Sequence, residues 1–344
     1  YKNLNKIIFK SKKISKHNVK EKILFDGDNF LITDSKGNVI VYSISSKNIV
    51  FKYNFYKKKY KKLKKILNIA IEKNIIYVAD NIGYLYAINY KDQNLLWAKN
   101  FRVPFRSNIK ITEEAIIVSD INNYIYFINK LTGEKSKILP TEEATVKNEF
   151  INSIALKNDY IFYLNTYGSI YSIDKSGKIN WFLNLNKSSD IDVSHLFNSN
   201  PLVLHQNKVV ISTHKLLHVL QSINGSTIFT IPISSIIKPL ISNNILFIVS
   251  KDNLLVCIDL NNGKIIYSID ISLEVANFLN EKKKSIYIQS LSMLNNNLFI
   301  FLDNSYYIIF NANGKIQDVK KLPEKLGTFP IFINESIIYL NNKN

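Results

Sequence analysis

A short unit that recurs along the whole chain constrains its fold more than any other feature. Residues 74–101 consist of runs of five to seven β-branched, aromatic and other apolar residues, separated by tight polar turns. Such runs are typical of antiparallel strands, and the turns leave no room for a helix of useful length. Gly83 lies in the first turn, where hairpins often require a residue with positive φ. The stretch therefore predicts three successive strands of a meander.

Similar units follow one another from residue 29 to residue 319. Tyr86, Tyr126 and Tyr171 hold the same place in three of them and lie 40 and 45 residues apart (126 − 86 and 171 − 126). Repeats of this length are typical of four-stranded propeller blades. A second marker is an aromatic residue four positions after a turn glycine, in the pairs Gly177/Trp181, Gly225/Phe229 and Gly263/Tyr267.

We predict an all-β fold: an eight-bladed β-propeller of four-stranded antiparallel blades, forming a single domain over residues 1–344. The last unit is a half copy, and a short apolar segment precedes the first full unit. We expect the N-terminal strand to complete the last blade, because a closed ring protects its edge strands. Loops at 186–195 and 273–284 precede blades five and seven. The expected blades are 22–55, 66–101, 103–140, 150–185, 196–233, 236–271, 285–322, and 325–344 together with 5–14.

The ends of the sequence bear on targeting. The chain begins at Tyr1 rather than Met, and it contains neither a signal peptide nor the 18 or more successive apolar residues of a transmembrane helix. We expect a mature or trimmed product whose targeting segment is missing.

The charge balance is strongly basic. Lys and Arg number 45 against 27 Asp and Glu, which gives a formal net charge of +18. This excess predicts attraction to anionic surfaces, although the frequent use of Lys, Asn and Ile along the whole chain indicates a compositional bias. The sharpest cluster runs from Lys57 to Lys65 and includes Tyr60. It is either a solvated loop between blades or a contact for an anionic membrane surface, with nucleic acid as the less favoured partner.

No catalytic motif is present: the sequence lacks a P-loop, a dinucleotide-binding glycine pattern, a nucleophile elbow and a His-Glu-x-x-His pair. His214 and His218 flank a predicted turn with no nearby acid, so we expect no metal site. Cys257 is the only cysteine and is expected to be a core residue. Trp97 and Trp181 lie on predicted outer strands and should pack between blades. Six acids at strand ends are expected to cap turns: Asp34, Asp80, Asp120, Asp174, Asp259 and Asp303.

The units at 83–89, 124–134 and 168–181 resemble the pyrroloquinoline-quinone-type propeller repeat, Gly-x-Leu-Tyr-Ala-Leu-Asp-x-x-Thr-Gly-x-x-x-Trp. Two families share this repeat: quinoprotein dehydrogenases and BamB, the propeller lipoprotein of the outer-membrane β-barrel assembly machinery. The chain is more similar to BamB. It has eight short copies, lacks the paired cysteines and catalytic insertions expected of the dehydrogenases, and shares the long loop before blade five and the closing N-terminal strand.

The resemblance implies a scaffold that is not an enzyme and has no cofactor or metal. It would lie in the periplasm at the outer membrane and bind the periplasmic domains of a BamA-like protein through loops on one face, as a monomer within that complex. Asp190 and Asp192 match the family's Asp-x-Asp contact segment before blade five, although they lie further from Pro201 than the family spacing suggests. The family's Leu-x-Leu-Arg segment before blade four is not kept, and the loop there offers only Val146 and Lys147. The family's lipid-bearing cysteine near the mature N-terminus is also missing.

Two other functions remain open. A quinoprotein dehydrogenase would bind pyrroloquinoline quinone and Ca²⁺, and a general interaction propeller would bind proteins or nucleic acid through its basic surface. The WD40 form of the second function is disfavoured, because no Trp-Asp or Gly-His pair ends any repeat.

Overall fold

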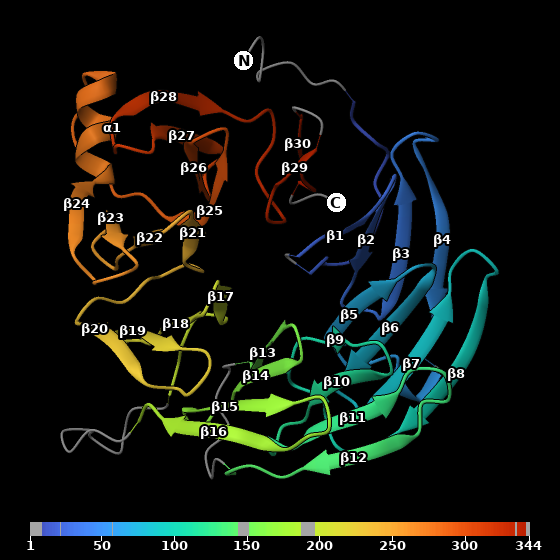
Figure 1. Cartoon of the computed structure of the whole chain (residues 1–344). Coiled ribbons are helices and arrows are strands. Elements are labelled where there is room, and N and C mark those ends of the chain that lie inside the picture. The colour runs from blue at the N-terminus through green and yellow to red at the C-terminus, as the bar shows by residue number, and fades with distance from the viewer. Residues whose placement is uncertain are drawn as a thin grey trace. The chain divides into compact units, whose positions relative to one another are not determined.

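The computed structural model describes residues 9–20, 22–56, 58–143, 151–186, 197–333 and 336–341. These residues form seven four-stranded antiparallel sheets, one two-stranded sheet, one α-helix and one turn of 3₁₀-helix (Figure 1). The prediction of an all-β fold built from four-stranded sheets is confirmed. The chain divides into two compact units, whose described residues lie within 9–196 and within 197–342 respectively.

The first unit contains four sheets, coloured from blue to yellow-green in Figure 1, and the 3₁₀ turn η1 (Lys58–Tyr60). Its strands are β1 (Leu24–Asp26), β2 (Asn29–Thr33), β3 (Asn38–Ser43) and β4 (Asn48–Asn54); β5 (Leu67–Glu72), β6 (Ile75–Asp80), β7 (Tyr84–Asn89) and β8 (Asn94–Asn100); β9 (Lys110–Ile111), β10 (Ala115–Ser119), β11 (Ile125–Asn129) and β12 (Lys135–Leu139); and β13 (Ser153–Lys157), β14 (Tyr160–Leu164), β15 (Ser169–Asp174) and β16 (Ile179–Asn184).

The second unit contains three four-stranded sheets, the two-stranded sheet and the helix α1 (Ile271–Leu279). Its strands are β17 (Val203–His205), β18 (Lys208–Ser212), β19 (Leu217–Gln221) and β20 (Thr227–Ile231); β21 (Leu240–Ser242), β22 (Ile245–Val249), β23 (Leu254–Asp259) and β24 (Ile265–Asp270); β25 (Ile288–Leu294), β26 (Asn297–Leu302), β27 (Tyr306–Asn311) and β28 (Ile316–Lys321); and β29 (Ile331–Ile333) and β30 (Ser336–Ile338).

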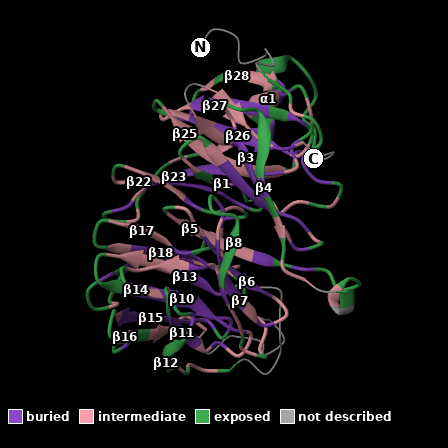
Figure 2. Ribbon diagram, turned by 90° about the vertical axis from the view of Figure 1, so that its right-hand side faces the viewer, coloured by how far each residue is buried: buried purple, intermediate pink, exposed green. Residues whose placement is uncertain are grey.

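Each four-stranded sheet is a meander whose middle strands are buried on both faces. In β6, Tyr77 and Ala79 pack against the following sheet, whereas Ile76 and Val78 pack against the preceding one. Successive side chains of a strand point to opposite faces, so a strand between two sheets needs apolar residues at every position. The fourth strands are more exposed, as Figure 2 shows for β4. This burial explains why the second and third runs of each repeat are continuously apolar.

A β-bulge recurs at the same place in all seven four-stranded sheets. The register shifts between the third and fourth strands, for example at Ala87/Ile88, Ser172/Ile173 and Cys257/Ile258. The same shift occurs in the other four sheets. The fourth-strand residue opposite the first member of each of these pairs is Trp97, Trp181 and Tyr267, respectively. The aromatic marker of the sequence therefore coincides with a repeated feature of backbone pairing.

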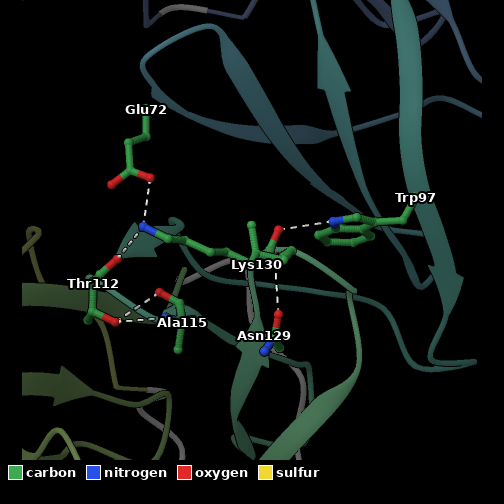
Figure 3. A network of polar contacts seen from close by, with 7 residues as sticks. Glu72, Trp97, Thr112, Ala115, Asn129 and Lys130 are labelled. Carbon is green, nitrogen blue, oxygen red and sulfur yellow. Dashed lines mark hydrogen bonds and ion pairs between the residues drawn. The ribbon is translucent and has the colours of Figure 1, made fainter.

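Two of these side chains, Trp97 and Tyr267, pack against a turn of the following sheet, an arrangement that we call the docking contact. The Trp97 indole donates a hydrogen bond to the carbonyl of Lys130 at 3.0 Å (Figure 3). A Cβ added to Gly133 would lie 2.4 Å from the Trp97 ring. The ammonium of Lys130 is fixed in turn by Glu72 at 2.8 Å and by the carbonyl of Thr112 at 3.2 Å.

The docking contact recurs in both units. Lys137 takes the aromatic position in β12, and its ammonium donates to the carbonyl of Ser176 at 2.7 Å. In the second unit, the Tyr267 hydroxyl donates to the carbonyl of Ala312 at 2.8 Å. Two features therefore require glycine in this turn of the repeat: its positive φ, and the close approach of a side chain from the preceding sheet.

Five of the six acids predicted to cap turns do so: Asp34, Asp80, Asp120, Asp174 and Asp259. The prediction is wrong for Asp303, where Oδ1 of the adjacent Asn304 accepts the N–H of Tyr306 at 3.3 Å instead. The Oδ1 atom of Asp80 accepts hydrogen bonds from the backbone N–H groups of Ile82, Gly83 and Tyr84 at 2.7 to 2.8 Å. Asp34 and Asp120 cap the equivalent turns of their own sheets in the same way. The carboxylate supplies an acceptor for N–H groups that the strands leave unpaired.

The helix α1 was not predicted, because residues 273–284 were expected to form a loop. Asp270 caps its N-terminus by accepting a hydrogen bond from the N–H of Leu273 at 3.0 Å. Asn280 ends it in the left-handed conformation, with φ of 52°. Both signals are present in the sequence, since Asp and Asn are common at these two helix positions.

The chain ends correspond in part to the expected closing blade. The C-terminal half copy forms two strands, β29 and β30, as its pattern predicts. In the N-terminal segment 5–14, residues 9–14 form no strand, and residues 5–8 lie outside the described part of the chain. Closure of eight blades into one ring therefore stays a prediction.

Candidate partner-binding surface

The four residues predicted to contact a partner lie outside the described residues. Val146 and Lys147 belong to segment 144–150, and Asp190 and Asp192 belong to segment 187–196. The structure does describe the residues that flank each segment, and these show how the fold positions the ends of both.

Glu142 lies two residues before segment 144–150, and its side chain is hydrogen-bonded to residues of the fourth sheet. The carboxylate accepts hydrogen bonds from the Tyr171 hydroxyl, from the Ser169 hydroxyl at 3.1 Å and from the Asn165 amide at 3.3 Å. The amide of Asn123 donates to the Glu142 carbonyl at 2.8 Å. Backbone and side chain are thus both fixed just before the segment begins.

Segment 144–150 ends next to Asn152, which is completely buried. Its amide nitrogen lies 2.7 Å from the Ser119 hydroxyl, 3.2 Å from the carbonyl of Asp120 and 3.2 Å from Oδ1 of Asn123. Its backbone forms an isolated bridge with Ser107. Asn123 therefore contacts residues on both sides of the segment, Glu142 before it and Asn152 after it.

These contacts form one buried polar network, which we call the loop-support cluster. Its members are Ser119, Asp120, Asn123, Asn152, Asn165 and Ser169, each at most 1% exposed. Buried polar groups are costly unless they are hydrogen-bonded, and hydrogen bonds shared among several side chains favour one arrangement. Within the described residues, Oδ1 of Asn152 is buried without a hydrogen-bond partner, whereas its amide nitrogen has three. The cluster therefore holds Glu142 and Asn152, which lie on either side of segment 144–150, in a defined position.

Three tyrosines complete the cluster as neutral donors. Tyr126 donates to Oδ2 of Asp120 at 2.8 Å, and Tyr163 donates to Ser119 and to the Asn123 carbonyl at 3.2 and 3.1 Å. Burial, and then the hydrogen bond to a carboxylate, raise the pKa of Tyr126 and of Tyr171 above the ordinary value. Burial likewise raises the pKa of Tyr163. All three hydroxyls therefore stay protonated at neutral pH and keep donating.

The flanks of segment 187–196 belong to different units and are each fixed within their own. In the first unit, the N–H of Leu185 donates to the Gly168 carbonyl at 2.9 Å. In the second unit, the amide of Asn200 donates to the Ser235 carbonyl at 2.7 Å, and Phe197 is buried. The described residues on both sides of this segment are thus hydrogen-bonded within their own units.

Sequence reasoning missed the loop-support cluster. One available signal was the asparagine at position 165, which replaces the aspartate that ends the second strand in the first three sheets. Its Oδ1 still caps the turn, accepting from the N–H groups of Tyr167 and Ser169, while its amide provides a donor that aspartate lacks. Asn152 gave no comparable signal, because its partners come from turns distant in the sequence.

The remaining candidates for chemistry have structural roles. Burial lowers the pKa of His218, and its ring Nδ1 lies 3.4 Å from the Thr230 hydroxyl. Among the described residues, no three His, Cys, Asp or Glu side chains are grouped so as to hold a metal ion.

Cys257 is buried in β23, as expected, and its burial raises the pKa of its thiol. In the part of the chain that the structure describes, no helix has the length and apolar character needed to cross a membrane.

Comparisons with known proteins agree on the architecture. BamB from Moraxella catarrhalis matches with a TM-score of 0.74 and 14% identity, over 96% of this chain and 97% of that chain. The computationally designed Ika8 protein matches with a TM-score of 0.70 and 11% identity, over 97% and 96%. The C-terminal WD40 domain of Sif2 matches with a TM-score of 0.63 and 12% identity, over 91% and 89%. At these identities the likeness shows the fold, which matches a β-propeller.

A sequence search of curated proteins found no match. The sequence model of one protein family, described as outer membrane protein assembly factor BamB, matches residues 54–268, which is more than half of the chain. The repeats, the sheets they form and this match lead to one conclusion: the chain belongs to the BamB family of outer membrane protein assembly factors.

Proposed function

We propose that this protein is a non-catalytic scaffold of the outer-membrane β-barrel assembly machinery, acting in the periplasm at the outer membrane. Its partner would be a BamA-like protein, whose periplasmic domains bind loops on one face of an eight-bladed, closed, single-domain propeller. Membership of the family supports the general role. The resemblance of Asp190 and Asp192 to the family's Asp-x-Asp segment supports these residues as contacts.

The observation that carries the proposal is the loop-support cluster. A buried network that fixes the residues on both sides of segment 144–150 suits a binding loop, because pre-organisation reduces the entropy lost on association. Val146 and Lys147 would be presented by this segment. A few such anchor residues determine most of the affinity of a protein interface.

A binding titration tests the partner and the site separately. The chain is titrated with the purified periplasmic domains of the BamA-like protein from the organism that produces this chain. Saturable binding is expected for the parent chain, with at least tenfold weaker binding for the double variant Asp190→Lys, Asp192→Lys. The matched control reverses two adjacent exposed acids, Glu113→Lys with Glu114→Lys, and should bind like the parent.

Each result has a definite consequence. Equal binding of the aspartate variant and the parent would reject the site, and no binding of the parent would reject the partner.

The absence of catalysis is tested by adding pyrroloquinoline quinone and Ca²⁺ and following dye-linked alcohol oxidation. We expect no turnover, and sustained turnover would favour a quinoprotein dehydrogenase instead.

A further inference from the structure

The basic run between β4 and β5 is more ordered than a solvated loop. Residues 58–66, which we call the basic loop, begin with the 3₁₀ turn η1. The N–H of Lys61 donates to the Lys58 carbonyl at 3.0 Å, and that of Leu63 donates to the Tyr60 carbonyl at 3.1 Å. Lys57 lies outside the described residues.

The tyrosines of this region point into the protein. The Tyr56 hydroxyl donates to Oδ2 of the buried Asp80 at 2.6 Å, and the hydroxyls of Tyr60 and Tyr84 lie 3.0 Å apart. The Tyr60 ring contacts Tyr56 and Tyr84 edge-on. These rings form the base of the basic loop and are already packed against other side chains.

The end of the basic loop is also fixed. Lys65 is 4% exposed, its ammonium donates to the Tyr60 carbonyl, and it lies 5.3 Å from the centre of the Tyr56 ring. Burial lowers the pKa of Lys65. Asn81 accepts a hydrogen bond from the N–H of Ile66 at 2.8 Å and donates to the Lys64 carbonyl at 3.1 Å. The loop therefore has a defined shape before any ligand binds.

The tip of the basic loop exposes both charge and apolar surface. Leu63 is 51% exposed and Ile66 is 45% exposed. Lys61, Lys62 and Lys64 are exposed, and their side chains make no hydrogen bond or ion pair with other described residues. Some other lysines of the same unit are paired with acids, as the exposed Lys175 is with Asp159 at 2.6 Å.

We propose that the basic loop binds the surface of an anionic phospholipid bilayer. The three lysines would pair with lipid phosphates, and Leu63 would enter the boundary between headgroups and acyl chains. Each lysine stem can lie along the apolar boundary while its ammonium stays in the phosphate layer. An exposed leucine between unpaired lysines is complementary to such a surface in both respects.

Nucleic acid fits these residues less well. Binding of single strands relies on aromatic side chains on which bases stack, and Tyr56 and Tyr60 are used inside the protein. A duplex would bind the lysines but would gain nothing from Leu63. The contribution of Leu63 therefore distinguishes a bilayer from a polyanion.

Vesicle co-sedimentation tests the proposal with the full chain. We expect binding to vesicles of phosphatidylcholine with phosphatidylglycerol, little binding to phosphatidylcholine alone, and a decrease with added salt. Replacing Lys61, Lys62 and Lys64 by Gln should lower the partition coefficient about a hundredfold, since each lysine near a membrane contributes roughly a factor of five. Leu63→Ser should lower it about tenfold, as expected for losing partial burial of one leucine.

The charge control removes three exposed lysines elsewhere in the same unit. Replacing Lys12, Lys13 and Lys16 by Gln changes the net charge equally and should leave most of the binding intact. Equal losses for the two triple variants would overturn the proposal, because binding would then follow net charge alone. The far-UV circular dichroism spectrum of each loop variant must match that of the parent, so that weaker sedimentation with vesicles reflects weaker binding and not unfolding.

A fluorescent probe reports insertion directly. Cys257 is 2% exposed and is the only cysteine among the described residues. In the Leu63→Cys variant, an environment-sensitive dye should therefore label position 63. We expect a blue shift with anionic vesicles at position 63 and none with the control Leu131→Cys, whose parent side chain is 77% exposed on another turn. The absence of a shift at position 63, or vesicle binding that is unchanged by Leu63→Ser, would refute a bilayer contact.

Discussion

The docking contact of Trp97 gives the sharpest test of how neighbouring sheets are held together. Gly133 has φ of +71°, and an added Cβ would lie 2.4 to 2.8 Å from three atoms of the Trp97 ring. Gly133→Ala therefore incurs two costs: about 1–2 kcal/mol for a left-handed non-glycine residue, and about 1–3 kcal/mol for overpacking. We expect a loss of about 2–5 kcal/mol in the free energy of unfolding.

Gly27 separates these two costs. Its φ is also positive, at +59°, but nothing lies within 4 Å of an added Cβ. Gly27→Ala should therefore cost only the backbone part, about 1–2 kcal/mol. Both variants and the parent are compared by equilibrium urea unfolding, followed by far-UV circular dichroism.

A double-mutant cycle then tests the contact itself. Trp97→Ala removes the ring and should cost about 3–5 kcal/mol, because the side chain is buried and its indole is hydrogen-bonded. In that background, Gly133→Ala should cost no more than Gly27→Ala does in the parent, which leaves a coupling of about 1–3 kcal/mol. An equal cost for Gly133→Ala with and without the ring would refute the docking contact as the reason for this glycine.

Three further predictions concern other parts of the fold. Burial raises the pKa of Tyr163 above its ordinary 10.0, so the unfolded chain loses this proton first as the pH rises. Stability should be unaffected by this group below pH 10 and fall above it, and Tyr163→Phe should flatten that alkaline slope in urea titrations; an unchanged slope would contradict this. Asn152→Ala leaves buried groups without a donor and should cost about 1–3 kcal/mol, with faster hydrogen exchange in the flanks of segment 144–150; unchanged exchange would show that the loop-support cluster does not fix them. Asp270→Ala removes the N-cap of α1 and should cost about 1 kcal/mol and speed exchange of its first amides. Asp270 also forms an ion pair with Lys283 at 2.6 Å, and a loss of stability with these amides still protected would show that only this ion pair matters.

The sequence predicted the elements that repeat. The second and third strands of each sheet are buried on both faces, so each of them is a continuous apolar run. These runs were recognisable in the sequence. Five of the six acids at strand ends were correctly expected to cap turns, because an Asx turn depends only on neighbours within four residues. Trp97 and Trp181 were correctly placed on fourth strands.

What the sequence did not predict depends on contacts between distant residues. Asn152 is bonded to residues 29 to 33 positions away, and no local pattern indicates that pairing. The basic loop had the composition of a solvated run, and only the structure shows Lys65 buried against Tyr56 while Lys61, Lys62 and Lys64 stay exposed. The helix α1 was missed for another reason: its cap residues also suit turns, and nine residues give a weak helical period.

Site-specific photo-crosslinking in cells tests the proposed scaffold function most directly. A photoreactive amino acid at position 146, in the segment flanked by residues of the loop-support cluster, should form a crosslink to a BamA-like protein. The same group at Leu131, an exposed position on another turn, serves as the control and should form none. A crosslink from position 146 that is lost on Asp190→Lys with Asp192→Lys would agree with the account. Expression of the probe-bearing chain with no crosslink to such a protein, or equal crosslinks from positions 146 and 131, would contradict it.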